Sequence, residues 1–262
     1  MKQGLTRNRG PFFMPEIQNR HQYRYYTAPW CRPIVRGPVA IRRNDKRMYR
    51  YSSKQHIKSL LVMGGIRIGT LYDFRRLEHK KGIADPQEGI KSVTHNIEFV
   101  SDGFGRQIDA DALVHYGLLA SDAERSGGGF IRNTRLSSIF DSPNIFILCF
   151  SRNLSNETMA QFEGADACVE ITDHEHFINR ITETLYIFCP VRFLGKYDVI
   201  YQDRNEVWNG QDWGHSPAVI KEIIFSPQAE IRLLWQPLYR REIEPIIFYD
   251  HLLGEYCREV TV

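Results

Sequence analysis

The chain has 262 residues, which is enough for one large domain or two small ones, and its composition is ordinary for a globular protein. The longest apolar runs are too short to cross a bilayer, and the first residues lack the apolar segment of a signal peptide. We therefore expect a cytoplasmic protein with no membrane partner. The five cysteines are widely separated and include no C-x-x-C pair, so the sequence predicts neither a disulfide framework nor a metal site.

Charge is distributed unevenly along the chain. Residues 1–50 contain twelve Lys and Arg against two acids, a net charge of +10, which leaves −7 for the remainder of a chain whose total is +3. Aromatic residues such as Tyr25, Tyr26 and Trp30 are interleaved with the basic ones. Arginine with aromatics suits phosphate contact and base stacking, so RNA or DNA is one predicted partner of residues 1–50. A protein partner such as an antitoxin, or the acidic remainder of the chain, is the alternative.

The domain organisation follows from the same change in composition. Regular hydrophobic patterns begin near Lys46, and no repeat or clear linker divides the residues that follow. We therefore predict a basic, aromatic-rich arm over residues 1–45 and a single α+β domain over residues 46–262.

Short strands outnumber helices in the predicted domain. Apolar runs and alternation predict strands over residues 46–53, 66–72, 92–100, 144–150, 167–171, 186–194, 198–201 and 246–249. Helices are predicted over residues 53–63, around 110–120, directly after Ser155 and directly after Asp173. The run at 144–150 predicts a central strand that is covered on both faces. The glycines at 127–129 predict a flexible loop, because no G-K-[ST] follows them as in a phosphate-binding loop.

The stretch from Lys221 to Trp235 carries the most suggestive polar residues. Two apolar segments separated by Pro227 predict two short strands or a bulged strand pair. In a strand, Gln228 and Glu230 would project to the same face, where an amide and a carboxylate can grip a hydroxyl and stabilise a nearby positive charge. The alternative is a half-exposed strand whose polar residues face water.

Polar residues also stand at the ends of two other predicted strands, so three segments share this feature: Arg50–Ser52, Cys149–Ser151 and Gln228–Glu230. In this order along the chain they resemble the motifs of the ADP-ribosyltransferase superfamily. Its members commonly show an Arg or His followed by small-x-Thr/Ser, then a Ser-Thr-Ser-like strand, then a late Q/E-x-E. The sequence departs from that pattern at three positions, where Cys149 and Phe150 replace the first two residues of Ser-Thr-Ser and Tyr51 stands where a small residue is common.

A closer resemblance is to an uncharacterised bacterial domain family, and it spans about residues 48–235. The frame Y-R-Y-S-S, then D-P-Q-E-G, then C-F-S-R-N, then F-S-P-Q-A-E-I-R is similar to that family's F-N-D-P-F-E, C-F-S and E-x-E-[WY]-R motifs. This second resemblance implies that the family is related to the transferase fold. The resemblance implies an α+β fold of split, mainly antiparallel β-sheets with flanking helices.

The resemblance also implies an activity, that of an NAD-dependent mono-ADP-ribosyltransferase acting as a bacterial toxin or phage-defence effector on nucleic acid or protein. Breaking the bond between nicotinamide and ribose builds up an oxocarbenium-like charge. The implied catalytic residues are Glu230, which would stabilise that charge, and Gln228, which would position the acceptor. The implied NAD-binding residues are Arg50, Tyr51, Ser52, Ser151 and Tyr72, with Arg50 on phosphate and Tyr51 or Tyr72 on nicotinamide.

Each assignment has a structural alternative. Arg50 would then only extend the basic run, Ser151 would only lead into a helix, and Glu230 would only pair with Arg232 or Lys221. Under that alternative the chain is a non-enzymatic module that binds nucleic acid or a protein partner through its N-terminal arm.

Overall fold

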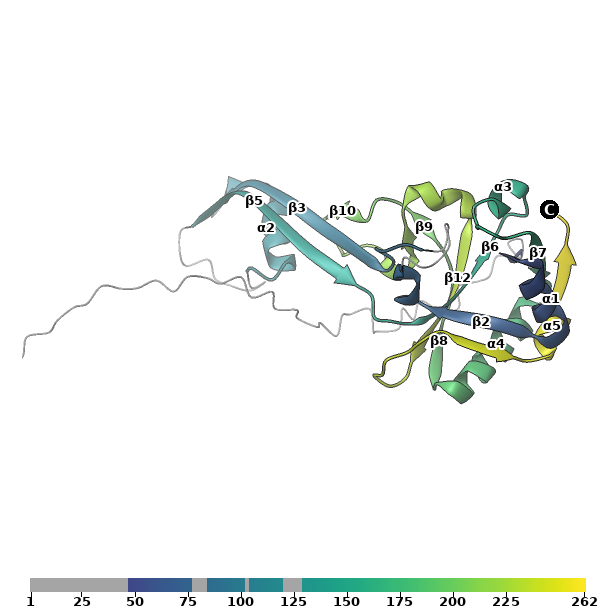
Figure 1. Cartoon of the computed structure of the whole chain (residues 1–262). Helices are drawn as coiled ribbons and strands as arrows, with labels where there is room; N and C mark the ends of the chain where they lie inside the picture. The colour runs from purple at the N-terminus through teal and green to yellow at the C-terminus, as the bar shows by residue number, and fades with distance from the viewer. Residues whose placement is uncertain (1–46, 77–83, 102–103, 120–128) are drawn as a thin grey trace, which may run out of the picture. The chain divides into compact units, whose positions relative to one another are not determined.

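The fold is organised around strand β6 (Phe146–Ser151), which pairs with three other strands. In this computed structural model, which describes residues 47–76, 84–101, 104–119 and 129–262, strand β12 (Glu230–Pro237) runs antiparallel along one edge of β6 (Figure 1). The other edge is shared: β1 (Tyr49–Ser52) pairs at Ser151 and β2 (Gly65–Thr70) pairs at Phe146 and Ile147. The sheet is therefore split between β1 and β2.

Four more strands extend this sheet outward from β1, β2 and β12, always in antiparallel pairing. They are β13 (Ile246–Tyr249) beside β2, β7 (Ala167–Ile171) beside β1, β14 (Cys257–Val260) beside β7, and β8 (Val191–Asp198) beside β12. The predicted fold class is confirmed, since the chain is α+β with mainly antiparallel sheets and flanking helices.

Three helices cover one face of the sheet: α1 (Lys54–Met63), α4 (His174–Phe188) and α5 (Leu252–Glu255). Local signals set their ends. Ser53 caps α1 by accepting a hydrogen bond from the backbone N–H of His56, and Gly64 ends it in the left-handed conformation at φ 64°. Buried side chains such as Phe177 of α4 and Trp235 of β12 form the core between helices and sheet, and each contributes roughly 1.5–3 kcal/mol.

The opposite face of β6 and β12 changes from apolar to polar along the strands. Ile147 and Leu234 lie in a small apolar cluster with the 3₁₀ turn η3 (Pro217–Val219). Further along, Cys149, Ser151 and their β12 partners Arg232 and Glu230 share that face, because residues two apart project to the same side of a strand. The end of this face holds the polar residues considered below.

A second sheet is built on two long strands, β3 (Ile90–Ser101) and β5 (Phe130–Asp141). The short strand β4 (Phe104–Gly105) pairs antiparallel with β3, β10 (Asn205–Val207) pairs parallel with it, and α2 (Gln107–His115) packs against it around Trp208 (Figure 1). The remaining short elements are α3 (Asn156–Met159), the 3₁₀ turn η2 (Asp73–Arg75), and the parallel pair β9 (Ile200–Tyr201) and β11 (Ile220–Lys221).

Two predicted elements differ from the structure, and one long strand was not predicted. Residues 186–188 end helix α4 and are not part of a strand. The apolar segment at 223–225 belongs to the 3₁₀ helix η4 (Ile223–Gln228) instead of a strand, with Pro227 inside it. The long strand β5 was not predicted, because most of its residues are exposed or half-buried and give no clear apolar alternation.

The chain from Lys46 to Val262 forms one compact unit. The predicted arm over residues 1–45, with its predicted nucleic-acid contacts, and the glycines at 127 and 128 lie outside the described residues. Among the residues that are described, no helix is long and apolar enough to cross a membrane.

Candidate functional site

One row of residues crosses three neighbouring strands and joins two of the motif segments, while its β1 member is Tyr49, which directly precedes the motif segment Arg50–Ser52. Tyr49 of β1 lies opposite Ser151 of β6, and Ser151 lies opposite Glu230 of β12. The hydroxyl of Ser151 donates a hydrogen bond of 2.7 Å to the backbone oxygen of Gln228. Ser151 therefore fastens the end of β6 to the turn that carries Gln228, and the structure brings these predicted site residues together.

The turn before β12 sets the directions of Gln228 and Glu230. The 3₁₀ helix η4 ends at Gln228, and Ala229 adopts the left-handed conformation at φ 43°, which is uncommon for a residue with a Cβ. The sequence predicts that the two residues share one face of a strand, and this prediction is wrong. Gln228 belongs to the helix and only Glu230 belongs to β12. The kink at Ala229 nevertheless brings both side chains to a common partner.

That partner is Lys221, at the end of β11. Its ammonium nitrogen lies 2.7 Å from Oε1 of Gln228 and 2.8 Å from Oε2 of Glu230. The side chains of Lys221 and Glu230 are each only 5% exposed. Lys221 is placed by the pairing of β11 with β9, where it lies opposite Tyr201, and the Tyr201 hydroxyl accepts a hydrogen bond from the backbone N–H of Glu230. One donor nitrogen thus holds an amide and a carboxylate side by side.

The second oxygen of Glu230 is held by a buried arginine. Oε1 of Glu230 accepts from Nε of Arg232 at 2.7 Å, and Nη1 and Nη2 of Arg232 donate to the two carboxylate oxygens of Glu88 at 2.7 and 3.0 Å. Glu88 ends the D-P-Q-E segment, whose first acid, Asp85, accepts from the buried Arg204. The D-P-Q-E turn is therefore clamped by two buried arginines and closes one side of the cluster.

The charge states follow from these contacts. Burial by itself raises the pKa of Glu230, but the charges of Arg232 and Lys221 overcome this and hold the pKa well below its usual range. Burial and the Glu230 carboxylate raise the pKa of the neighbouring Cys149 thiol well above its usual value. At neutral pH the cluster therefore contains an ionised Glu230 beside a protonated, unreactive thiol.

Arg50 lies at the split in the sheet. Alternation along β1 directs it to the helix-covered face, opposite the face of Tyr49, Ser151 and Glu230, so the structure does not bring Arg50 and Glu230 together on one face. Its Nη1 donates a hydrogen bond of 3.3 Å to the backbone oxygen of Cys149. This oxygen belongs to the stretch of β6 between the positions where β1 and β2 pair. Burial lowers the pKa of the Arg50 guanidinium. Within the described parts of the chain no carboxylate pairs with it, so a cation stands in the split with donors to spare.

Tyr51 and Ser52 contact the segments next to β1. The Tyr51 hydroxyl donates to the backbone oxygen of Asn153 at 2.7 Å and accepts from the backbone N–H of Ser155 at 2.9 Å, and its ring stacks on Phe162. The Ser52 hydroxyl lies 3.4 Å from Nδ1 of His56. Both residues support the start of α1 and the loop after β6.

Tyr72 lies at the other end of β6. Its backbone N–H donates to the side-chain oxygen of Asn144. Asn144 is seven residues before Ser151, and seven residues of extended chain span roughly 20 Å. The guanidinium of Arg75 lies 4.1 Å above the Tyr72 ring. The structure therefore separates Tyr72 from Glu230, whereas it places Tyr51 on a neighbouring strand.

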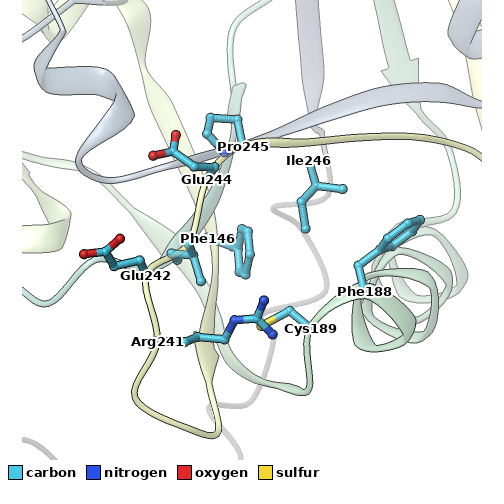
Figure 2. Close-up of a pocket in the computed structure, with 9 residues that line it drawn as sticks. Phe146, Phe188, Cys189, Arg241, Glu242, Glu244, Pro245 and Ile246 are labelled. Carbon is cyan, nitrogen blue, oxygen red and sulfur yellow. The ribbon is translucent and has the colours of Figure 1, made fainter.

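A cavity of about 320 Å³ also opens at this far end of β6 (Figure 2). Its lining includes Phe146 at the start of β6, Phe188 and Cys189 at the end of α4, and the segment from Arg241 to Ile246. None of the predicted site residues lines it. The cavity and the Glu230 cluster are separate features of the fold.

Sequence reasoning missed the partners that complete the cluster. Lys221 and Arg232 were considered only as structural partners of Glu230, while Glu88, Tyr201 and Arg204 were not considered at all. The sequence contains the acidic pair of D-P-Q-E, but it does not indicate that these acids are buried and paired, since acidic side chains are mostly exposed. Among the described residues, no group of three or more His, Cys, Asp and Glu side chains is arranged to hold a metal ion.

Comparisons with protein-family models, with curated proteins and with solved structures give no significant match. The resemblance to ADP-ribosyltransferases thus rests on the motifs themselves, and the activity that it implies is a proposal.

Proposed function

We propose that the chain is an NAD-consuming ADP-ribosyltransferase whose catalytic carboxylate is Glu230. The observation that carries this proposal is the convergence of Gln228 and Glu230 on one donor, at 2.7 and 2.8 Å from a single nitrogen. A ribose hydroxyl has a single hydrogen to donate, so a ribose that replaced Lys221 would use two hydroxyls, one for Gln228 and one for Glu230. The row of Tyr49, Ser151 and Glu230 across three strands gives this pair a rigid base.

Cleavage of the bond between nicotinamide and ribose is favoured by an ionised carboxylate next to the ribose. As the bond between nicotinamide and ribose breaks, its electron pair leaves with nicotinamide and positive charge develops on the sugar. Glu230, which is ionised at neutral pH, would stabilise that charge. The acceptor nucleophile then bonds to the ribose carbon and loses a proton to solvent, with Gln228 positioning the acceptor.

The other proposed roles follow the remaining motif residues. Arg50 lies on the face opposite Glu230, so its guanidinium would have to reach through the split in the sheet to bind the diphosphate of NAD bidentately. Ser151 and Ser52 would hold the ends of β6 and β1 in place. Tyr51 is better placed than Tyr72 to contact nicotinamide, because Tyr51 lies on the strand next to Ser151.

Lys221 must release the carboxylate during this reaction. Its ammonium and the Arg232 guanidinium together offset the charge of Glu230, and a carboxylate neutralised in this way stabilises a nearby cation weakly. We therefore expect NAD binding to displace Lys221 from Glu230, which frees one oxygen for the ribose.

The direct test is nicotinamide release from NAD by the purified chain. The proposal predicts release above the rate in buffer, and a radiolabelled NAD experiment on cell extract would identify the acceptor class by sensitivity of the label to protease or nuclease. Gln228→Ala should reduce transfer to the acceptor more than it reduces hydrolysis. Absence of both release and transfer, with intact folding, contradicts the proposal.

One observation favours a second function. Both oxygens of Glu230 already accept from buried cations, as expected for a purely structural residue. In that case the chain is a nucleic-acid-binding or protein-interaction module that works through residues 1–50. Nucleic-acid binding without any nicotinamide release would support this function.

A further inference from the structure

Three phenylalanines at the end of the second sheet are largely exposed. Phe99 of β3 is 46% exposed, Phe104 of β4 is 74% exposed and Phe130 of β5 is 66% exposed. They share one face, because Phe104 and Phe130 both lie opposite Ser101, and Phe99 is two residues before Ser101. The rings of Phe99 and Phe130 stack with their centroids 6.3 Å apart. The three rings therefore form one aromatic face, roughly 10 Å across from β4 to β5.

A shift in the alternation of the two long strands turns this aromatic face away from the core. Ile97 and Val100 of β3 are three residues apart, yet both belong to the core that packs against α2, so the alternation shifts between them. On β5 the facing residue is Asn133, which has the left-handed conformation at φ 49°. Asparagine adopts this conformation more readily than most residues. Without the shift, Phe99 would point into the core together with Ile97.

Two arginines accompany the rings on the exposed side of the strands. Arg132 lies directly opposite Phe99. Arg135, three residues further along β5, points away from the core because its neighbour Leu136 is buried there. In the described part of the chain neither guanidinium has a hydrogen-bond or ion-pair partner, and Glu98, the one acid of β3, pairs with neither. The aromatic face therefore carries two cations that the chain itself does not pair.

We propose that the aromatic face binds single-stranded nucleic acid, with bases stacked on the phenylalanine rings and phosphates bound by Arg132 and Arg135. Aromatic side chains on the surface of a β-sheet stack two or three unpaired bases in RNA-binding domains. Every base has a flat π face, so such a surface discriminates little between sequences. This site is separate from the contacts predicted for residues 1–50, and it does not depend on any activity on NAD.

The mixture of rings and cations favours nucleic acid over a membrane surface. Arg132 lies opposite Phe99 and two residues from Phe130, so insertion of the rings into lipid would carry a guanidinium with them at a cost in free energy. A single strand presents a flat base and a phosphate at every nucleotide, which matches rings interspersed with arginines. A duplex is a poorer partner, because its bases are already stacked and paired inside the helix.

Photocrosslinking of the full chain locates the contact. The probe is an oligouridine of about ten nucleotides that contains iodouridine, which crosslinks to aromatic side chains on which it stacks. Mass spectrometry should find crosslinks at Phe99, Phe104 or Phe130, and the same strand in a duplex should give fewer. Crosslinks confined to residues 1–50, or no crosslinks at all, overturn the proposal.

Alanine variants of the full chain measure the stacking and the phosphate contact separately. Phe130→Ala should raise the dissociation constant for this oligonucleotide by roughly 5- to 100-fold in fluorescence anisotropy, the loss expected for one stacked base. Tyr249→Ala, which removes a 65% exposed ring from β13, should leave the dissociation constant unchanged. Equal effects of these two variants, or binding to phosphatidylglycerol vesicles with none to the oligonucleotide, overturn the proposal.

The salt dependence of the same affinity tests the phosphate contact. Arg132→Ala should reduce the slope of log affinity against log salt by about 0.7, the value for one phosphate of a single strand. Lys58→Ala, at an exposed position on α1, should leave the slope unchanged. An unchanged slope in Arg132→Ala overturns the phosphate contact.

Discussion

The ammonium nitrogen of Lys221 lies 2.8 Å from Oε2 of Glu230, and both side chains are almost fully buried. Two residues of opposite charge in the protein interior stabilise each other, but removing one leaves the other without compensation. This pair therefore determines both the stability of the site and the access of a substrate to Glu230.

Replacement of Lys221 by methionine should destabilise the fold. Methionine fills a similar volume without the charge, so Gln228 loses its donor and Glu230 keeps only Arg232 as a cationic partner. We expect the free energy of unfolding to fall by about 3 kcal/mol, measured by urea denaturation. Lys58→Met, at an exposed position on α1, should change it by less than ~0.5 kcal/mol. Equal effects of the two substitutions would mean that the buried contact contributes nothing.

Stability should depend on pH through Glu230. The folded-state pKa of Glu230 is depressed, so its contribution is present above the unfolded-state pKa, about 4.3, and is lost as pH falls from there through the folded pKa. Glu230→Gln removes this group from the titration. The difference in unfolding free energy between the wild type and the variant should be largest at pH 7 and should narrow below about pH 4.3.

The measurement is a series of urea titrations from pH 7 to pH 3. A difference that stays constant across this range would show that Glu230 is not held as an ionised group.

Arg50 should be needed for NAD binding in a way that Arg47 is not. A hydrogen bond to a charged group contributes ~1.5–3 kcal/mol. Arg50→Ala should therefore weaken NAD binding by tenfold to a hundredfold in titration calorimetry. Arg47→Ala, at an exposed position in the same basic run, should leave the affinity unchanged. Equal losses at the two positions would mean that only net charge matters.

The basic arm should make a salt-sensitive contact with a polyanion. If residues 1–45 contact six or more phosphates, affinity for RNA or DNA should fall by about 10³ or more between 50 and 200 mM salt, because bound counterions are released. Fluorescence anisotropy with labelled oligonucleotides measures this. Deletion of residues 1–45 should remove this salt-sensitive binding and leave nicotinamide release intact. Binding that is insensitive to salt, or absent at low salt, would instead favour a protein partner.

Local signals predicted much of the fold. Ser53 and Gly64 identify the two ends of α1 because capping depends on nearby residues, and the apolar run at 144–150 identifies β6 as the central strand. The segment at 223–225 was misassigned because its apolar content suggests a strand, yet Ile223 and Ile224 are exposed and lie on a 3₁₀ helix. Composition alone does not reveal which apolar residues a chain leaves in solvent.

The site was predictable only in part. The motifs identified Ser151, Gln228 and Glu230, which the structure brings together. The pairing of Arg232 with Glu88 joins residues 144 positions apart, and nothing in a single sequence indicates such a contact. The closeness of Lys221 to Glu230 depends on the left-handed turn at Ala229, a conformation that alanine does not signal.

The rate of nicotinamide release by Glu230→Gln, measured in single turnover with saturating NAD, tests the central claim most directly. The substitution keeps the shape of the side chain and removes its charge. If Glu230 stabilises the ribosyl cation, the chemical step should slow by roughly two to three orders of magnitude, and the affinity for NAD should hardly change. Glu98→Gln, at an exposed position on β3, should retain the wild-type rate. A folded Glu230→Gln protein that releases nicotinamide as fast as the wild type would contradict the catalytic assignment.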